Sequence, residues 1–264
     1  MNANRIIGII PARYGSSRFP GKMLATIAGK PLIQHTWEKA KGFACIDDLV
    51  VATDDQRIYD CIDQLGGQVV MTSVSCPSGT DRLAEVVRDH PRFRETDIIV
   101  NIQGDDPFIN EATIQHAASH LLADKEAVMG TAVCPLTCPS LAADPSVVKC
   151  VLDLQGNALY FSRSLIPGGH SLQALPSHTY YHHIGLYLFR PDFLLKYGTL
   201  PPTPLQLAED LEQLKVIEHG YRIRAAVVPP LNGVHINTQE DLIKAEAYLC
   251  PQNSFSSPAA SALR

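Results

Sequence analysis

The sequence predicts an α/β fold: a mainly parallel β-sheet, helices on both of its faces, and an inserted antiparallel lobe. Short apolar runs alternate with helical patterns up to about residue 140, which is the rhythm of successive β-α-β units. The first run, residues 5–10, is apolar at consecutive positions, as expected of a strand buried on both faces. Beyond about residue 140 a hairpin pattern replaces the alternation of strands and helices, so the antiparallel lobe is expected there.

The first half of the chain follows the alternating pattern element by element. Residues 31–42 predict a helix, because Pro31 suits its first turn and Gly42 the position past its end. Ser78 or Thr80 suits the cap of a later helix, and Asp54 is expected to cap the helix after the second strand. The further strands are expected at 47–53, 68–72, 97–103 and 127–133, and the further helices at 55–67, 79–90 and 110–124.

The second half contains the expected lobe. Residues 146–153 and 158–162 flank Gly156 and predict a hairpin. A long loop without periodicity follows at 163–183, and such loops are often functional. A strand is expected at 184–189, a single helix at 204–220, a strand at 221–228 and a last helix at 238–250. We therefore expect one domain over 1–250, with its lobe at about 141–215, and a disordered tail at 251–264.

Composition narrows the class of protein. The chain has 264 residues, 45% of them hydrophobic and 19% charged, which is an ordinary globular balance. Its net charge of −5 argues against a nucleic-acid partner. We see no signal peptide and no stretch near the roughly 18 apolar residues of a membrane span, so we expect a cytoplasmic protein without membrane insertion. The seven cysteines are odd in number and scattered, so we expect no disulfide framework and mostly buried thiols.

A loop rich in cations follows the first strand. Arg13, Arg18 and Lys22 are interspersed with glycine and serine, whose backbone N–H groups can face phosphate oxygens. The loop lacks the patterns G-x-x-x-x-G-K-[ST] and G-x-G-x-x-G, so it is neither a Walker A loop nor a dinucleotide fingerprint. In an acidic protein such a cluster indicates a small anionic ligand, although a solvated basic loop is the alternative.

Polar residues also lie in two other loops of this kind. Asp105 and Asp106 come directly after a buried strand, where two carboxylates suit Mg2+, although Gly-Asp-Asp-Pro is also good turn chemistry. Ser78 and Thr80 lie at a helix N-terminus, which suits a base or phosphate as well as a simple cap. Cations for phosphate and a carboxylate for magnesium at one sheet edge indicate phosphoryl or nucleotidyl transfer.

Taken together, the motifs are more specific than any one of them. "IIPARYGSSRFPGKML", "VATDDQRI", "SGTDRLAEVV", "VNIQGDDP", "VKCVLDLQGNALYFSRSLIP", "HHIGLYLFR" and "LAEDLEQLKVIEHG" occur in this order over about 245 residues. The chain closely resembles the 3-deoxy-manno-octulosonate cytidylyltransferases, or CMP-Kdo synthetases. The resemblance implies a Rossmann-like nucleotidyltransferase fold, the substrates CTP and Kdo, Mg2+ as cofactor, a homodimer formed through the lobe, and a role in lipopolysaccharide biosynthesis.

The resemblance also implies residue roles. Arg13, Lys22 and Asp105 correspond to catalytic positions. The positions on the nucleotide side are Ala12, whose backbone groups are candidates for selecting cytosine, with Arg13, Ser16, Lys22, Ser78, Thr80, Arg82 and Gln103. The positions on the sugar side are Arg163, His183, Tyr187, Glu212 and Gln213. The metal positions are Asp105 and Asn237.

Asn237 is a departure from the family pattern. The usual Gly-Val-Asp-Thr-Pro-Glu-Asp-Leu reads "GVHINTQEDL" here, so Asn237 stands where an Asp is a second magnesium ligand. Asn offers a carbonyl oxygen without a negative charge, so weaker Mg2+ binding is expected. Two alternatives stay open: a cytidylyltransferase for another acidic or amino sugar, such as sialic acid or 8-amino-Kdo, and a non-catalytic nucleotide-binding protein.

Overall fold

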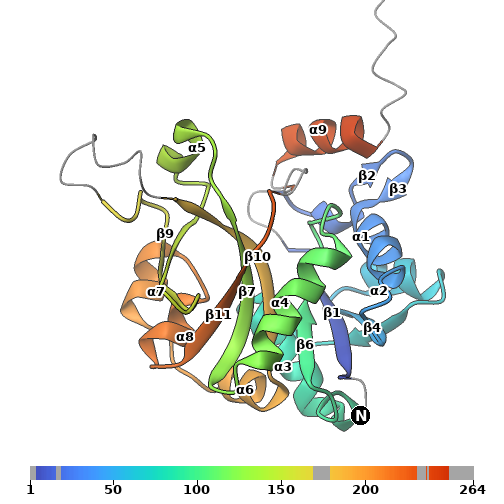
Figure 1. The fold of residues 1–264 in the computed structure, drawn as a ribbon. Coiled ribbons are helices and arrows are strands. Elements are labelled where there is room, and N and C mark those ends of the chain that lie inside the picture. Colours follow the sequence, from blue (N-terminus) through green and yellow to red (C-terminus); the bar gives the residue numbers. More distant parts are fainter. Residues whose placement is uncertain (1–3, 16–18, 169–178, 231–235, 237, 250–264) are drawn as a thin grey trace, which may run out of the picture.

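The computed structural model describes residues 4–15, 19–168, 179–230, 236 and 238–249. In this part of the chain one sheet contains β1 (Ile6–Ala12), β4 (Asp48–Thr53), β5 (Gln68–Met71), β6 (Ile98–Asn101), β7 (Ala127–Pro135), β8 (Lys149–Leu152), β9 (Ala158–Ser162), β10 (Tyr181–Phe189) and β11 (Arg222–Val227). The order is β11-β7-β10-β6-β1-β4-β5, and the β8–β9 hairpin is joined to β10 (Figure 1). β2 (Thr26–Ile27) and β3 (Lys30–Pro31) form a separate small hairpin.

The sheet is mixed, as predicted. β1 is parallel to β4 and β6, β4 is parallel to β5, and β7 is parallel to β11. β10 is antiparallel to β6 and β7, and β8 is antiparallel to β9 and β10. β10 begins three residues before the expected strand and lies inside the main sheet, between β7 and β6. The expected lobe is therefore continuous with the central sheet through this strand.

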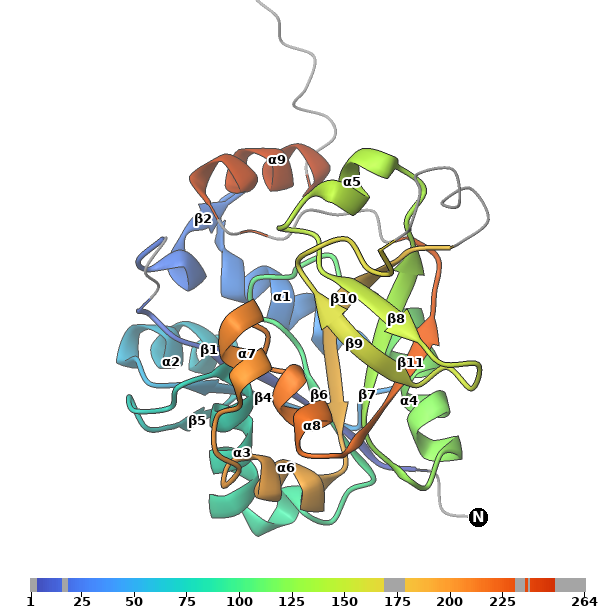
Figure 2. The same cartoon turned by 90° about the vertical axis from the view of Figure 1, so that its left-hand side faces the viewer.

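Helices cover both faces of the sheet (Figures 1 and 2). One apolar core joins the sheet to α1 (Leu32–Lys41), α2 (Gln56–Asp63) and α4 (Glu111–Ala123). A second core joins its other face to α3 (Gly79–Asp89), α6 (Pro191–Tyr197) and α8 (Leu214–Glu218). β1 contributes to both, because side chains alternate across a strand. Ile6 and Ile10 belong to the first core, and Ile7 and Ile9 to the second.

A third, small core lies above the sheet's edge in Figure 1, under α9 (Gln239–Leu249). It contains Ile27, Leu32, Ile236 and Ala245. The backbone N–H of Ala28 donates to Glu246 Oε1 at 3.1 Å, so α9 is held against the β2–β3 hairpin by polar and apolar contacts. The remaining short elements are η1 (Lys22–Leu24), η2 (Pro91–Phe93), α5 (Pro139–Ala143) and α7 (Pro204–Glu209).

Two expectations about helices are wrong. The single helix expected at 204–220 is interrupted, because Asp210 at the end of α7 has a left-handed φ of 53°, which no helix continues through. Asp54 does not cap α2: Asp55 does, accepting the backbone N–H of Arg57 at 3.0 Å. The sequence analysis also missed α5 and α6, which both begin at a proline. In the described part of the chain, no helix combines the length and apolar character needed to cross a membrane.

Candidate active site

The candidate site lies at the edge where β1, β4 and β6 end. These strands are neighbours and parallel, so the residues that follow Ala12, Thr53 and Asn101 emerge side by side. Ligands bind at this edge in open α/β sheets. The cation-rich loop and the Asp105 loop are thereby brought together, although they are about ninety positions apart in the chain.

Lys22 and Asp105 form the closest charged contact of this edge. Lys22 Nζ lies 2.5 Å from Asp105 Oδ2 and donates to the backbone carbonyl of Ile236 at 2.9 Å. The lysine side chain is 11% exposed and the aspartate side chain 24%, so both are partly shielded from water. The turn before Lys22 depends on Gly21, whose φ of 71° is costly for other residues.

The two adjacent aspartates have different surroundings. Asp106 is buried, and its Oδ1 accepts the backbone N–H of Phe108 at 3.1 Å, so this carboxylate stabilises the turn. Asp105 instead faces Lys22. Gly104 allows the close approach, because a Cβ there would lie 3.1 Å from both Met23 Sδ and the Pro11 carbonyl oxygen. Asp106 therefore serves the turn, whereas the metal prediction concerns Asp105.

Arg13 is an exposed cation at this edge. It follows Ala12, the last residue of β1, and its guanidinium makes no hydrogen bond or ion pair with any other described residue. An exposed guanidinium directly after a buried strand can bind an anion without first breaking an internal contact. Ser16, also expected on the nucleotide side, lies outside the described residues.

A chain of hydrogen bonds connects Gln103 to the start of α3. Gln103 Nε2 donates to Asn101 Oδ1 at 3.4 Å, and Asn101 Nδ2 donates to Thr80 Oγ1 at 3.5 Å. Ser78 caps α3, since its Oγ accepts the backbone N–H of Asp81 at 3.1 Å. The sequence analysis missed Asn101; its signal was a polar residue inside a run of buried apolar ones, where an amide needs partners.

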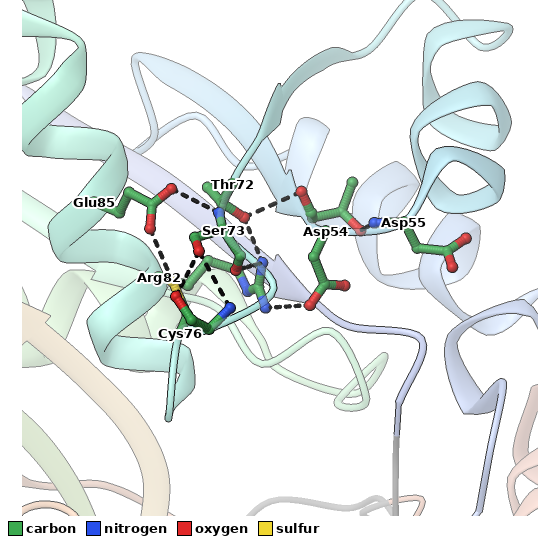
Figure 3. Close-up of polar contacts among 9 residues, drawn as sticks. Asp54, Asp55, Thr72, Ser73, Cys76, Arg82 and Glu85 are labelled. Atoms are coloured by element: carbon green, nitrogen blue, oxygen red, sulfur yellow. Dashed lines mark hydrogen bonds and ion pairs between the residues drawn. The ribbon is translucent and has the colours of Figure 1, made fainter.

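Arg82 is buried at the sheet edge, where its guanidinium faces residues that follow β4 and β5 rather than solvent. Its side chain is 3% exposed, and its Nη2 lies 2.7 Å from Asp54 Oδ2. Nη1 donates to the Thr72 hydroxyl (Figure 3). The structure therefore places Arg82 behind the expected nucleotide stretch, and its contact with a nucleotide stays a prediction.

Glu212, one of the residues expected to bind the sugar, lies near Thr80, one of those expected to bind the nucleotide. Burial raises the pKa of its carboxyl group, and hydrogen bonding from the Thr80 hydroxyl opposes that rise. Thr80 also accepts from Asn101, so the end of the chain that begins at Gln103 lies near Glu212. The structure thus brings one residue of each expected set into contact.

Three expected sugar residues form a second buried chain. The Tyr187 hydroxyl donates to Gln213 Oε1 at 3.1 Å, and Gln213 Nε2 lies 3.5 Å from His183 Nδ1. Burial raises the pKa of Tyr187 well above its ordinary value, so the phenol stays a donor.

The contact of His183 with Thr131, at the other end of this hydrogen-bond chain, indicates which ring nitrogen carries the proton. His183 Nε2 lies 2.9 Å from Thr131 Oγ1, whose own proton goes to the Leu186 carbonyl at 2.7 Å. The hydroxyl therefore accepts, which places the His183 proton on Nε2 and leaves Nδ1 to accept from Gln213. The ring is thus oriented by a hydrogen-bond partner on each side.

Arg163 is held by the backbone around it. Its Nε donates to the Glu209 carbonyl at 2.8 Å, and its Nη2 donates to the Asp210 carbonyl at 3.2 Å. Beneath it, the buried Lys149 donates to the carbonyls of Asp144, Val147 and Arg163 at 2.9, 2.7 and 2.5 Å. Sequence reasoning missed Lys149, because a lysine in a strand normally reads as an exposed residue.

The metal prediction can be examined only at Asp105. Asn237 lies outside the described residues, but the preceding Ile236 donates its N–H to the Asp105 carbonyl at 3.4 Å. Among the residues that the structure describes, no three His, Cys, Asp or Glu groups cluster as metal ligands. Mg2+ bound with phosphate needs only one or two carboxylates, so Asp105 suits that ion better than a metal held by protein alone. All six described cysteines are free thiols, but only Cys134 and Cys150 are buried, so the expectation that most of them are buried is wrong for this part of the chain.

The arrangement as a whole suits transfer of a phosphate-containing group. One sheet edge offers an exposed guanidinium, a shielded ammonium and a carboxylate. Two separate hydrogen-bond chains lie behind it, one that joins Gln103 to Thr80 and one that orients His183. Cations can bind a polyphosphate, and these polar groups can bind a hydroxylated partner beside it.

Comparisons with known proteins agree with this geometry. A family model described as cytidylyltransferase matches residues 7–223. A protein of Protochlamydia amoebophila named 3-deoxy-manno-octulosonate cytidylyltransferase is 52% identical over 251 residues, which cover 95% of this chain and 96% of that protein. An Arabidopsis thaliana protein of the same name, designated mitochondrial, is 45% identical over 95% of this chain and 85% of its own.

A solved structure agrees as well. It is a CMP:2-keto-3-deoxy-manno-octonic acid synthetase in complex with CTP, and it superposes with a TM-score of 0.86 at 38% sequence identity. The match covers 94% of this chain and 99% of the other. The likeness extends over the sheet edge and the β8–β10 region alike, since so little of either chain is left out.

Proposed function

The chain belongs to the 3-deoxy-manno-octulosonate cytidylyltransferase family, and on that premise we propose that it transfers CMP from CTP to Kdo in lipopolysaccharide biosynthesis. The products are CMP-Kdo and pyrophosphate. The observation that carries the proposal is the pairing of Lys22 with Asp105 beside the exposed Arg13, at the edge where an α/β sheet binds its ligand.

The reaction exchanges one bond at phosphorus for another. The C2 hydroxyl oxygen of Kdo attacks the α-phosphorus of CTP, the bond to the β-phosphate oxygen breaks, and the hydroxyl proton is released. Catalysis is then mostly positioning and neutralisation of charge. Lys22 would stabilise the charge that grows on the α-phosphoryl oxygens, and Arg13 would hold the triphosphate. Both roles match cations that the structure places at this edge.

Mg2+ is the proposed cofactor, held by Asp105 and Asn237 together with phosphate oxygens. The fit rests on a partly shielded carboxylate at the sheet edge, with the segment before Asn237 hydrogen-bonded beside it. When bound, Mg2+ neutralises triphosphate charge and lowers the pKa of a nearby hydroxyl. Lys22 occupies one oxygen of Asp105, so its ammonium would turn toward the triphosphate in the loaded enzyme.

The nucleotide and sugar would lie on either side of the Thr80–Glu212 contact. On the nucleotide side we propose backbone groups at Ala12 for the base and Gln103 for the ribose, with Ser16, Ser78, Thr80 and Arg82 in the surrounding stretch. On the sugar side we propose Arg163 for the Kdo carboxylate and Glu212, Gln213, His183 and Tyr187 for its hydroxyls. Support comes from two hydrogen-bond chains, one that joins Gln103 to Thr80 through Asn101 and one that joins Tyr187, Gln213 and His183.

We also propose a homodimer formed through residues 141–215 and a location in the cytoplasm. Leu159, Leu205 and Leu207 are exposed apolar side chains in this lobe, which suits a protein contact. Light scattering on purified protein would measure the mass directly: twice the chain mass supports the dimer, and 28.8 kDa contradicts it.

Pyrophosphate release tests the proposed function. We expect release that requires CTP, Kdo and Mg2+ together, and little release with UTP in place of CTP. Comparable turnover with sialic acid or 8-amino-Kdo would favour an enzyme for another acidic or amino sugar. CTP binding without pyrophosphate release from any sugar would favour the non-catalytic alternative, whose support is Asn237.

A further inference from the structure

Asp54 lies beside the candidate site without being part of it. It follows β4 at the same sheet edge, but its carboxylate is turned toward α3 (Figure 3). Its Oδ2 lies 2.7 Å from Arg82 Nη2, and the two side chains are 13% and 3% exposed. The neighbouring Asp55 caps α2 and pairs with the exposed Arg57, so the two adjacent carboxylates serve different elements.

Arg82 and Glu85, one turn apart on α3, hold the loop that precedes this helix. Arg82 Nη1 donates to the Thr72 hydroxyl and to the Ser73 carbonyl. Glu85 Oε1 accepts the Ser73 N–H at 2.6 Å, and its Oε2 accepts from Cys76 Sγ at 3.0 Å. The loop is therefore fixed through both its donors and its acceptors (Figure 3).

The position of this loop decides where α3 begins. It leads directly into Ser78, the cap of α3, and Thr80, which accepts from Asn101 at the end of the chain that begins at Gln103. A Cβ at Gly79 would lie 3.3 Å from Pro11 Cγ, so the helix start is packed against the end of β1. A small shift of the loop would move Thr80 relative to both expected substrates.

We propose that Asp54 is a positioning residue: through Arg82 it fixes the 72–77 loop, and thereby places Ser78 and Thr80 for the nucleotide. The inference rests on the proposed function, because it assumes CTP at this edge. Asp54 orients the guanidinium so that its other nitrogen meets Thr72 and Ser73. Without the carboxylate, Arg82 keeps its charge in a nearly dry site and loses the partner that sets its direction.

The test compares Asp54→Asn with two controls. Asp89→Asn removes an exposed carboxylate paired with Arg88 near the end of α3, and Ile223→Val removes a methylene group from the buried core on β11. We expect Asp54→Asn to raise the KM and the Kd for CTP about tenfold, the order found when a supporting residue behind a site is lost. The KM for Kdo should change less than about twofold, and both controls should keep wild-type values.

A double-variant cycle separates positioning from direct contact. Arg82→Lys keeps the charge but cannot reach Asp54, Thr72 and Ser73 at once. If Arg82 acts through the loop, Asp54→Asn/Arg82→Lys should be no worse for CTP than either single variant. Additive losses would mean that Arg82 binds the nucleotide itself, and would overturn the proposal. If Asp54→Asn does not fold, Asp54→Leu/Arg82→Met removes both charges together and is expected to show the same rise in KM for CTP.

The results of these experiments distinguish a failure of the positioning role from a failure of the proposed function. A wild-type protein that neither binds CTP nor releases pyrophosphate would overturn both. An active wild type with unchanged CTP affinity in Asp54→Asn would overturn the positioning role alone. Equal rises in the KM for CTP and for Kdo, matched by Ile223→Val, would show a general loss of stability and would also overturn it.

Discussion

Replacing Lys22 with methionine is the sharpest perturbation of the candidate site. Methionine keeps most of the side chain's length but removes the ammonium that lies 2.5 Å from Asp105 and 2.9 Å from the Ile236 carbonyl. The chain also offers a matched control. Lys30 pairs with Glu38 at 2.7 Å, but these side chains are 46% and 38% exposed. Lys30→Met removes a similar contact in water.

The two substitutions should differ by orders of magnitude in turnover. Loss of one group that stabilises transition-state charge in a shielded site lowers kcat by about 10² to 10³, or about 2.7–4 kcal/mol. An exposed ion pair is worth only about 0.2–1 kcal/mol and touches no substrate here. We therefore expect Lys22→Met to lose at least about a hundredfold in kcat, and Lys30→Met to match the wild type.

The assay is pyrophosphate release at saturating CTP and Kdo, with Mg2+ varied. Thermal unfolding should show that both variants are folded. In the free protein Lys22 competes with Mg2+ for the Asp105 carboxylate. The Mg2+ concentration for half-maximal activity should therefore be no higher in Lys22→Met than in the wild type. A kcat within about threefold of wild type would refute the reasoning, since it would leave less than about 1 kcal/mol for the ammonium.

Three further predictions concern stability, pH and metal. Lys149→Met should lower the free energy of unfolding by about 2–4 kcal/mol in urea titrations, because three partly buried carbonyls lose their donor and only part of this is offset by the lysine's desolvation; a change under about 1 kcal/mol would contradict this. The pKa of Glu212 is raised by burial, so its protonated form favours folding at low pH, and that contribution is lost as the pH rises from the unfolded value of 4.5 through the folded one. Glu212→Gln should therefore flatten the fall of the melting temperature over that range, and an unchanged slope would count against it. Asn237→Asp should lower the Mg2+ concentration for half-maximal activity by about tenfold, since it restores a negative charge to the site; an unchanged midpoint would show that residue 237 does not contribute to metal binding.

Much of the fold could be predicted from local patterns. Residues 5–10 are apolar on both faces, and β1 is indeed buried throughout because both of its faces carry helices. The hairpin around Gly156 was also predicted correctly. By contrast, the break at Asp210 left no clear local signal, because the apolar periodicity of 204–220 continues across it. Only the left-handed φ of Asp210 ends the helix.

The arrangement of the candidate site could also be predicted only in part. The proximity of Lys22 to Asp105 was expected, since loops after neighbouring parallel strands meet at one edge. The choice between Asp54 and Asp55 was not predictable, because both can cap a helix and only tertiary packing brings Arg82 to one of them. Lys149 was missed for a similar reason: its carbonyl partners come from separate segments.

The central claim is tested most directly by identifying the product. The protein should be incubated with CTP, Kdo and Mg2+, and both CMP-Kdo and pyrophosphate should be quantified by mass spectrometry and an enzyme-coupled assay. We predict equal amounts of the two products, none without Kdo, and at least about a hundredfold less from Lys22→Met. Pyrophosphate without CMP-Kdo, or CMP-Kdo at the wild-type rate from Lys22→Met, would contradict the mechanism.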